Sequence, residues 1–288
     1  MLNIITNGKS GKGRGRKNAK KIVEYCMKNG IDYALYFTTR RGHATEIARS
    51  ISSNGENTIV ALGGDGTFHE ILNGIADFEK TTLGFIPSGR GNDFARTMGL
   101  KLKPIEALKD ILRGETRKID YIEVGENLRC LNICGTGLDV DVLRNVEGKT
   151  NKITYIVSLL KMVVNFKPYK VTVTADNGES ITYEDCIVAD ICNGKAFGGN
   201  IKISPDSKID DGKLDLIVVT MPADGKLLPV VPKFIAGAHM NLDITHHSAV
   251  ERVVVECDHA IELDGEIYED GKLDCKIVKG GLTTFAIL

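Results

Sequence analysis

Along residues 1–120, short apolar runs alternate with segments in which apolar residues recur every three or four positions. The first pattern is typical of buried strands, and the second of helices that cover a sheet. Four strand–helix units with short connections predict a parallel sheet with helices on both faces. The predicted strands are Leu2–Thr6, Asp32–Thr38, Thr58–Leu62 and Leu83–Pro87, and the predicted helices are Lys17–Lys28, His43–Ser53, Phe68–Ala76 and Pro104–Arg113.

From about residue 119 the chain changes to short strand-like runs separated by turn dipeptides such as Asp211-Gly212 and Asp264-Gly265. Two helical stretches interrupt them, Asn151–Val164 and Leu227–His239. We therefore predict an α/β domain over residues 1–120 and a mostly antiparallel β-sandwich domain over residues 121–288, whose last strand can return to the first domain. The strands predicted for this second domain are Tyr121–Val124, Arg129–Cys134, Tyr169–Thr174, Ile181–Ile191, Leu214–Thr220, Arg252–Cys257, Ala260–Leu263, Leu273–Val278 and Thr283–Leu288.

Composition narrows the class of protein. The chain has 288 residues and a net charge of −1, with 37 Lys and Arg against 38 Asp and Glu, so it lacks the basic excess of a nucleic-acid binder. Its seven cysteines form no Cys-x-x-Cys pair and fit buried thiols in a reducing cytosol. No apolar run approaches the ~18 residues of a membrane span, and Met1–Thr6 is too short for a signal-peptide core. We expect a cytoplasmic protein without a transmembrane segment.

Candidate chemistry is concentrated in the loops that follow the predicted strands. Gly63-Gly64-Asp65-Gly66-Thr67 lies between a strand and a helix, where backbone N–H groups and the helix N-terminus favour phosphate, and Asp65 can hold Mg²⁺ directly or through water. Tight packing alone is the competing explanation of these glycines.

Two further loops carry candidate chemistry. Asn7–Gly11 follows the first strand but lacks the Walker A pattern, and a solvated basic loop explains it equally well. Pro87–Arg96 follows the fourth strand and combines a tight turn, a helix cap and a cation at Arg90.

These three loops, in this order and spacing, resemble the catalytic domain of the diacylglycerol kinase family, which includes bacterial lipid kinases and the sphingosine and ceramide kinases. The resemblance extends over essentially the whole chain. It implies an ATP- and Mg²⁺-dependent lipid kinase, with residues 1–120 binding nucleotide and residues 121–288 binding substrate. Arg90 stands where the family pattern has threonine, which implies a cationic phosphate contact instead. The residues assigned to ATP are Asn7, Gly8, Lys9, Ser10, Gly11, Thr38, Gly63, Gly64, Asp65, Gly66, Thr67, Arg90 and Asn92.

The same resemblance assigns the catalytic and metal-binding residues. Asp65 and Glu266 are the catalytic carboxylates, and Glu266 matches the proposed general base. Asp93 and Asp120 match a water-and-magnesium network. The Asp211 carboxylate, with the carbonyls of Lys208 and Lys213, matches a structural Mg²⁺ site. Turn chemistry is the competing explanation of both Asp211 and Glu266, and Asp139 and Asp141 fit solvated turn residues.

The acceptor implied by the resemblance is a lipid hydroxyl at a membrane surface, with diacylglycerol as the first choice. An NAD kinase-like phosphotransferase and a non-catalytic nucleotide-binding regulator are the alternatives. Peripheral contact with the inner membrane face is expected through basic residues 9–21 or through Leu227–His239, although a solvated loop and a core helix explain these segments equally well. A homodimer is the default assembly for a soluble oligomer.

Overall fold

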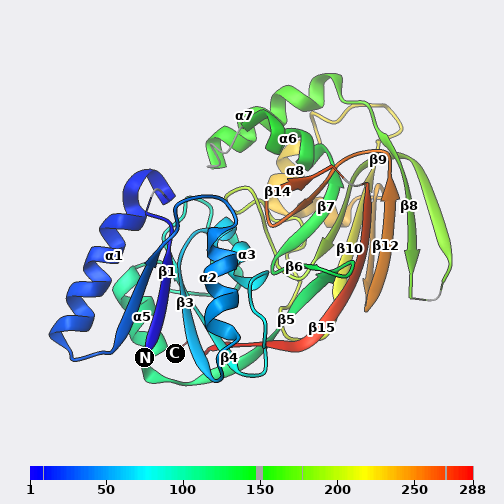
Figure 1. The fold of residues 1–288 in the computed structure, drawn as a ribbon. Coiled ribbons are helices and arrows are strands. Elements are labelled where there is room, and N and C mark those ends of the chain that lie inside the picture. Colours follow the sequence, from blue (N-terminus) through cyan, green and yellow to red (C-terminus); the bar gives the residue numbers. More distant parts are fainter. Residues whose placement is uncertain (9, 147–151, 177, 270, 288) are drawn as a thin grey trace. The chain divides into compact units, whose positions relative to one another are not determined.

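The computed structural model describes residues 1–8, 10–146, 152–176, 178–269 and 271–287 (Figure 1). The chain divides into two units by its internal contacts. Unit 1 comprises Met1–Asp120 and Gly280–Leu288, and unit 2 comprises Tyr121–Lys279. Among the described residues, no helix combines the length and the apolar character needed to cross a bilayer.

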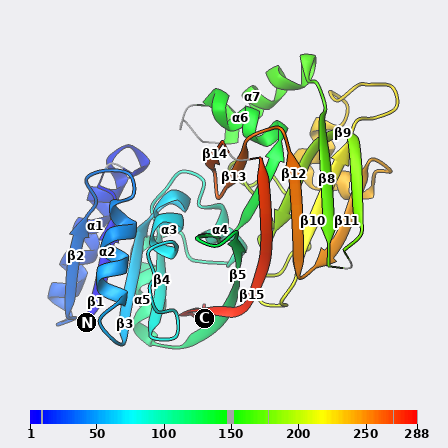
Figure 2. The ribbon, with the colours of Figure 1, turned by 45° about the vertical axis from the view of Figure 1, so that its right-hand side comes forward.

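Unit 1 is built on a parallel sheet whose strands lie in the order β2 (Tyr33–Phe37), β1 (Leu2–Thr6), β3 (Asn57–Gly63) and β4 (Thr81–Pro87), as Figure 2 shows. The chain reverses its direction of travel across the sheet between β1 and β3. In open α/β sheets, ligands bind beyond the carboxyl ends of the strands at such a reversal. The helices of this unit are α1 (Ser10–Lys28), α2 (His43–Ser52), α3 (Asp65–Leu72), α4 (Asp93–Thr97) and α5 (Pro104–Arg113).

Both faces of this sheet are buried, as the alternation in the sequence predicts. On one face, Ile4, Leu62 and Ile86 pack in one apolar cluster with residues of α1 and α5. On the other, Phe85 of β4 meets Phe68 and Phe94 edge to face, with ring centroids 4.9 and 5.6 Å apart. This core fixes the register of the strands, so the loops that follow β1, β3 and β4 emerge at the same edge.

Helix α1 begins earlier than the prediction of Lys17–Lys28, because it starts at Ser10. Four buried residues recur at helical spacing along this segment, namely Gly15, Ala19, Ile22 and Cys26. The buried face of the helix therefore extends to residues that precede Lys17. Arg14, Arg16 and Lys17, which belong to the basic stretch that suggested a loop, are exposed on this helix instead.

Unit 2 is mostly antiparallel, and the predicted combination of an N-terminal parallel α/β domain with a C-terminal β-sandwich is confirmed. The main path of its sheet runs β14 (Glu266–Tyr268), β13 (Ile261–Leu263), β7 (Ile133–Gly137), β9 (Ser180–Cys192), β8 (Tyr169–Ala175), β12 (Arg252–Cys257) and β15 (Lys272–Phe285). Off this path, β10 (Leu214–Thr220) pairs with β9 and β11 (Thr245–Val250), while β5 (Thr116–Val124) pairs with β6 (Leu128–Cys130) and β15.

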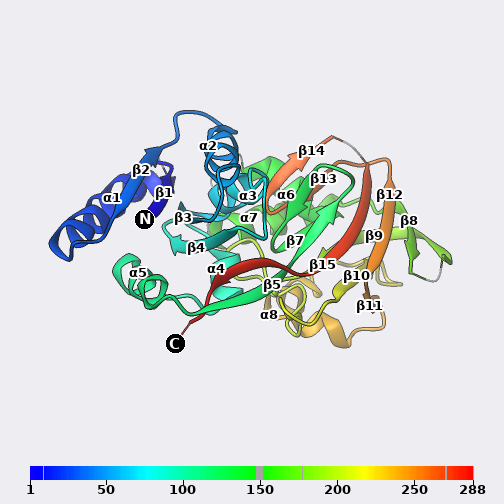
Figure 3. The ribbon, with the colours of Figure 1, turned by 60° about the horizontal axis from the view of Figure 1, so that its bottom comes forward.

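The last strand differs from the prediction of two separate runs, because β15 is continuous. Its first residues pair with β12, and Thr283 and Thr284 pair in parallel with β4, so its end lies in unit 1. Figure 3 shows β5 and β15 side by side. The sequence obscured this continuity, because a pair of adjacent glycines is a common signal for a strand end and the strand contains Gly280 and Gly281.

Several other elements of unit 2 differ from the prediction. The run Arg129–Cys134 divides into β6 and β7, while β11, β14 and helix α6 (Leu138–Val146) were not predicted. Helix α7 (Lys152–Met162) lies within the predicted segment, whose first residue, Asn151, is outside the described residues. Helix α8 is only Val231–Ala236, because Pro232 stands at its start and Gly237, at φ 79°, ends it in the left-handed conformation.

Two apolar clusters hold unit 2 together. One fills the interior of the sandwich and includes Ala189 and Ile191 of β9. The other includes Val188 and Cys192 of the same strand and packs with residues of α6 and α7 and with Val231 of α8. The helices therefore cover one outer face of the sheet.

Two carboxyl groups, those of Glu262 and Asp190, are buried under this helical layer. They lie in register with Gly135 across β13, β7 and β9. A Cβ on Gly135 would lie 1.9 Å from Oδ1 of Asp190, so this carboxyl occupies the space that a side chain at 135 would need. Asp190 has no exposed surface, and neither of its oxygens has a hydrogen-bond partner among the described residues. Burial, followed by the charges of Asp139 and Glu262, raises the pKa of Asp190 well above its usual range.

We expect Asp190→Asn to stabilise the protein more at about pH 8 than at about pH 5. Because the pKa of Asp190 is raised in the folded state, deprotonation above about pH 4 favours the unfolded chain, and an amide removes that penalty. An amide can also donate to a neighbouring carboxyl. Melting temperatures of the variant and the original chain across this pH range measure the effect, at roughly 2–4 °C for each kcal/mol.

Asp258→Asn, at an exposed carboxyl of the same unit, is the control and should change the melting temperature little at either pH. A gain from Asp190→Asn that is equal at both pH values would contradict a charge-based penalty at this position.

Candidate functional site

The loops after β3 and β4 meet through two glycines. A Cβ on Gly64 would lie 2.8 Å from the Cα of Gly89, and a Cβ on Gly89 would lie 2.5 Å from the Cα of Gly64. Neither position has room for a side chain, so both require glycine. The N–H of Ser88 also donates to the carbonyl of Gly63 over 2.6 Å. This close approach brings the loop after β4 against the N-terminus of α3, a place where N–H groups without helical partners favour an anion.

Asp65, the first residue of α3, joins the same two loops. Its Oδ2 accepts the N–H of Asn92 at 2.8 Å, and its Oδ1 accepts the N–H of Phe94 at 3.3 Å. These N–H groups belong to the start of α4, where helical partners are absent. Burial, followed by the charge of Asp93, raises the pKa of Asp65 to about 7, while the two N–H donors oppose the shift. The Asp65 carboxyl therefore gains or loses its proton near neutral pH.

Asn92 and Asp93 hold the tip of the loop after β4. Asn92 has φ 52° and ψ 44°, a left-handed conformation that asparagine tolerates, and its Oδ1 accepts the N–H of Gly89 at 2.9 Å. A Cβ on Gly91 would lie 2.9 Å from Oδ2 of Asp93 and 3.1 Å from Oδ2 of Asp65, so two carboxylates flank one backbone position. Arg90 stands between Gly89 and Gly91 and is half-buried.

Asp120, which the sequence grouped with Asp93, is buried in β5. Its Oδ1 accepts the N–H of Gly280 at 2.6 Å, so this carboxylate joins β5 to the end of the chain within unit 1. Across the described residues, no group of three or more Asp, Glu, His or Cys side chains is arranged to hold a metal ion. The magnesium-network role of Asp93 and Asp120 stays a prediction.

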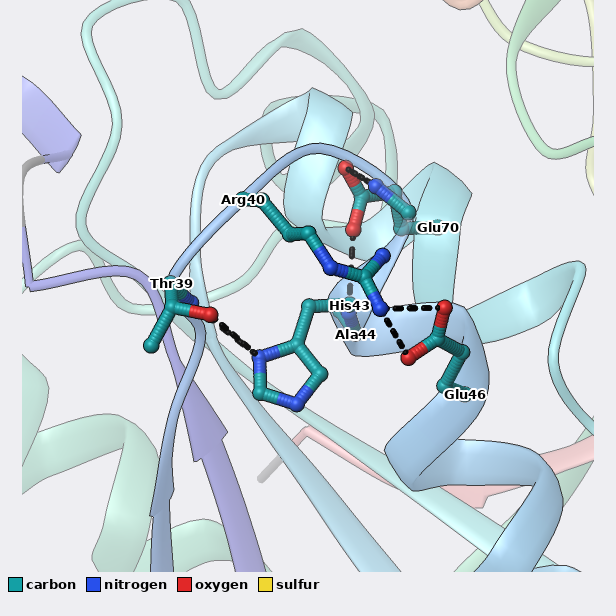
Figure 4. A network of polar contacts seen from close by, with 7 residues as sticks. Thr39, Arg40, His43, Ala44, Glu46 and Glu70 are labelled. Atoms are coloured by element: carbon teal, nitrogen blue, oxygen red, sulfur yellow. Dashed lines mark hydrogen bonds and ion pairs between the residues drawn. The ribbon is translucent and has the colours of Figure 1, made fainter.

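The loop after β2, which carries Thr38, is held by the polar network in Figure 4. The N–H of Thr38 donates to the carbonyl of Thr6 at 2.9 Å, which keeps the two strand ends together. The Glu70 carboxylate of α3 accepts the N–H groups of Gly42 at 3.0 Å and Ala44 at 3.1 Å, so it caps α2 from a neighbouring helix. Figure 4 also shows contacts between Thr39 and His43 and between Arg40 and Glu46.

The loop after β1 is short. Asn7 and Gly8 follow the strand, Lys9 lies outside the described residues, and α1 begins at Ser10, so Gly11 belongs to the first turn of that helix. In the parallel register, Thr6 lies opposite Leu62. The start of α1 and the glycine loop that ends with Gly66 and Thr67 in α3 are therefore at the same edge of the sheet.

In unit 2, Glu266 begins β14 directly after a tight hairpin turn at Asp264 and Gly265, which have φ of 51° and 87°. The Asp264 carboxylate accepts the N–H groups of Leu131 at 3.0 Å and Asn132 at 2.8 Å. This hairpin is anchored to the connection between β6 and β7, so Glu266 stands on a rigid support.

The segment assigned to structural magnesium is an exposed turn. The Oδ1 of Asp211 accepts the N–H of Lys213 at 3.1 Å, and Gly212 has φ 72°. The Nζ of Lys213 forms an ion pair with Glu251 at 2.7 Å, and Lys208 is exposed. The local geometry is that of an Asp-Gly turn. Magnesium binding by Lys208, Asp211 and Lys213 stays a prediction.

The prediction of Asp139 as a solvated turn residue is wrong, because it is only 4% exposed at the start of α6. Burial raises its pKa to about 6, and neither carboxyl oxygen has a hydrogen-bond partner in the described chain. Asp139 lines a small, largely apolar pocket within unit 2, with a cavity volume of about 30 Å³. A sequence signal was present, since Gly135-Thr-Gly-Leu-Asp139 is another glycine-rich passage from strand to helix.

The pocket is lined mainly by the helical layer of unit 2. Tyr155, Leu159 and Val163 come from α7 and the turn that follows it, and Leu227 and Val231 come from the segment around α8. Apart from Asp139, the side chains that line it are apolar or aromatic.

Comparison with known proteins covers both halves of the chain. Residues 1–124 match the diacylglycerol kinase catalytic domain, and residues 132–285 match the YegS C-terminal NAD kinase beta sandwich-like domain. A diacylglycerol kinase of Bacillus subtilis (strain 168) is 28% identical over 271 residues, which cover 91% of this chain and 88% of the relative. A diacylglycerol kinase of Mycobacterium tuberculosis (strain ATCC 25618 / H37Rv) is 27% identical over 284 residues, covering 96% and 90%.

Solved structures give the same result. A diacylglycerol kinase from Bacillus anthracis str. Sterne superposes with a TM-score of 0.80 at 27% identity, covering 99% of this chain and 96% of that one. An NAD kinase from Archaeoglobus fulgidus in complex with ATP reaches a TM-score of 0.54 at 14% identity, covering 99% and 93%, and shares the fold alone. The resemblance found in the three glycine loops is thereby confirmed, and the chain belongs to the diacylglycerol kinase catalytic-domain family.

Proposed function

We propose that this protein transfers the γ-phosphate of ATP to the hydroxyl of a lipid, with diacylglycerol as the substrate and phosphatidic acid as the product. Membership of the family supports a kinase. The single observation that favours a lipid acceptor is the apolar pocket of unit 2, whose walls suit hydrocarbon and carry one buried carboxylate, Asp139.

Asp139 is the acceptor that this pocket offers to a bound donor. Its oxygens accept no hydrogen bond from the described residues, and burial raises its pKa to about 6. An unpaired buried carboxylate is costly, and a donor that enters the pocket, such as water, removes part of that cost. The apolar walls would hold hydrocarbon of the acceptor, whose hydroxyl is left for Glu266.

The edge of the sheet in unit 1 fits nucleotide phosphates. The contact between Gly64 and Gly89 leaves the backbone open to an anion, and Arg90 supplies a cation in the same loop. Asp65 and Asp93 are the carboxylates that would hold Mg²⁺, since both flank Gly91 and carboxylate oxygen is the preferred donor. When bound, Mg²⁺ supplies charge neutralisation for the transferring phosphate.

Glu266 would act on the acceptor hydroxyl. As the lipid oxygen bonds to the γ-phosphorus and the bond from that phosphorus to ADP breaks, the hydroxyl proton passes to the Glu266 carboxylate. The hairpin that carries Glu266 is anchored through Asp264. A rigid support favours a general base, because phosphoryl transfer depends mainly on positioning.

The competing acceptor is NAD. Its case rests on the shared fold of an archaeal NAD kinase at 14% identity. NAD is a charged dinucleotide, and the pocket walls of unit 2 are apolar or aromatic apart from Asp139. A non-catalytic regulator has no use for a base at Glu266. Both alternatives are therefore less well supported than a lipid kinase.

With radiolabelled ATP and Mg²⁺, the protein should phosphorylate diacylglycerol in preference to other hydroxyl lipids and to NAD. The assay compares diacylglycerol, a sphingoid base, phosphatidylglycerol and NAD under identical conditions. A chelator should abolish transfer, and added Mg²⁺ should restore it. Labelling of NAD with no labelled lipid would overturn the proposal, and labelling of another lipid would correct the substrate.

Asp65→Asn should lower kcat by about 100-fold or more, because the amide cannot replace the charge that holds Mg²⁺. It keeps one acceptor for α4, so the free energy of unfolding should fall by only about 1 kcal/mol.

The pH dependence of the rate tests the same residue. Since the pKa of Asp65 is about 7 and the ionised form is required, kcat/KM for ATP should rise with pH through that value in the original chain and not in the variant. Glu79→Gln, at an exposed carboxylate of unit 1, is the control. A near-normal rate in Asp65→Asn would refute this role.

Glu266→Gln should lower kcat by about 100-fold or more while ATP affinity changes little, because a general base acts in the transfer step. Steady-state kinetics and equilibrium ATP binding measure the two effects separately. Glu269→Gln, at an exposed carboxylate nearby in the sequence, is the control. Equal losses of kcat and ATP affinity would show that Glu266 positions the nucleotide instead.

A further inference from the structure

Glu262 is a buried carboxyl group in the hairpin that carries Glu266. It stands in the middle of β13 and is only 4% exposed. Its Oε2 accepts the N–H of Gly265 over 2.6 Å. Gly265 directly precedes Glu266 in the chain, so a side chain from the core of unit 2 holds the backbone next to the candidate base.

The hairpin turn gives the N–H of Gly265 no partner of its own. Leu263 pairs with Glu266 in the antiparallel register, and the two residues between them form the turn. These are Asp264 and Gly265, with φ of 51° and 87°. In a two-residue turn the backbone hydrogen bonds join the flanking residues, so the N–H of the second turn residue needs a side chain or water as acceptor. Glu262 supplies that acceptor.

The turn is therefore held at two points by two carboxyl groups. The Asp264 carboxylate accepts the N–H groups of Leu131 and Asn132, which ties the turn to the connection between β6 and β7. Glu262 ties the same turn to β13. A single attachment leaves a turn free to pivot, whereas two attachments on different elements fix the direction in which the chain enters Glu266.

The uncharged form of Glu262 suits this position. Burial, followed by the charge of Asp139, raises the pKa of Glu262 well above its usual range, and the charge of Glu266 contributes in the same direction. A protonated carboxyl group still accepts an N–H through its carbonyl oxygen. An ionised Glu262 would repel the charge of Glu266 and favour protonation of the base. The neutral group supports the turn without that effect.

We propose that Glu262 is a positioning residue, which fixes the turn before Glu266 and so holds the Glu266 carboxylate where it can receive the proton of the acceptor hydroxyl. The inference rests on the proposed function, because that function makes Glu266 the base. Placement matters steeply for such a group, since a displacement of about 1 Å can lower a rate about a hundredfold.

Two variants of similar length separate the acceptor from the shape of the side chain. Glu262→Gln keeps a carbonyl oxygen for the N–H of Gly265, and Glu262→Met fills the same space without one. With the lipid substrate, Glu262→Met should lower kcat about tenfold to a hundredfold and change ATP affinity less than about twofold. Glu262→Gln should stay within about threefold of the original kcat. An unchanged kcat in Glu262→Met, or equal losses in both variants, would overturn the proposal.

The Glu266→Gln background tests whether Glu262 acts through the base. Added to Glu266→Gln, the change Glu262→Met should alter kcat by less than about twofold, because the group that it positions is already absent. A further loss as large as the loss in the original chain would show a general structural effect and would also overturn the proposal.

Amide hydrogen exchange tests the contact without any activity. Gly265 is exposed, yet its N–H is bonded to a buried group, so it should exchange at least about tenfold more slowly than in an unstructured chain. Glu262→Gln should keep this protection and Glu262→Met should remove it. Rapid exchange of Gly265 in the original chain would contradict the inference whether or not the variants fold.

The two readouts separate this inference from the proposed function. Absence of lipid phosphorylation by the original chain, with Gly265 protected from exchange, would refute the proposed function and leave the contact with Glu262 in place. An active original chain and an equally active Glu262→Met variant would refute the positioning role alone.

Discussion

The backbone contact between Gly64 and Gly89 is the constraint on which the candidate phosphate site of unit 1 depends. Because these two residues have no side chains, the loops after β3 and β4 can touch, and Asp65 can reach the N–H groups of Asn92 and Phe94. The same carboxylate is then held in a half-buried position beside Asp93, and desolvation raises its pKa to about 7. One steric constraint therefore sets both the shape of the loops and the protonation of the carboxylate between them.

Unit 2 shows the opposite arrangement, with acidic groups that the fold leaves uncompensated. Asp190 and Asp139 are buried without hydrogen-bond partners in the described chain, and Glu262 is buried in register with Asp190. Such groups cost free energy and persist where a site needs them. Asp139 faces the apolar pocket, so its cost has a functional explanation in the proposed lipid site. Asp190 and Glu262 do not line this pocket, and burial, followed by the charge of Asp139, hinders their ionisation.

Much of the fold could be predicted from local pattern, and the failures have physical causes. Helix Pro104–Arg113 and strand Leu214–Thr220 were predicted at their observed bounds, because each has a strong period and clear ends. The early start of α1 was missed because Gly15 looks like a loop residue until the packing of Ala19 and Ile22 is known. The continuity of β15 was missed because its pairing with β4 is remote in sequence. For the site, the glycine loops and Asp65 carried a local signal, whereas the burial of Asp139 depends on how α6 and α7 cover the sheet.

Helix α7 is the case in which the sequence pattern misleads most. Apolar residues all round a helix normally indicate complete burial, and the segment was accordingly predicted only as an interruption of the sandwich. In the structure, one side lines the pocket while Ile153 and Val157 on another side remain exposed. Nothing in the order of the residues distinguishes a buried apolar side from an exposed one, because both obey the same period. Only the tertiary fold separates them, because it decides which side packs on the sheet and which side stays in solvent.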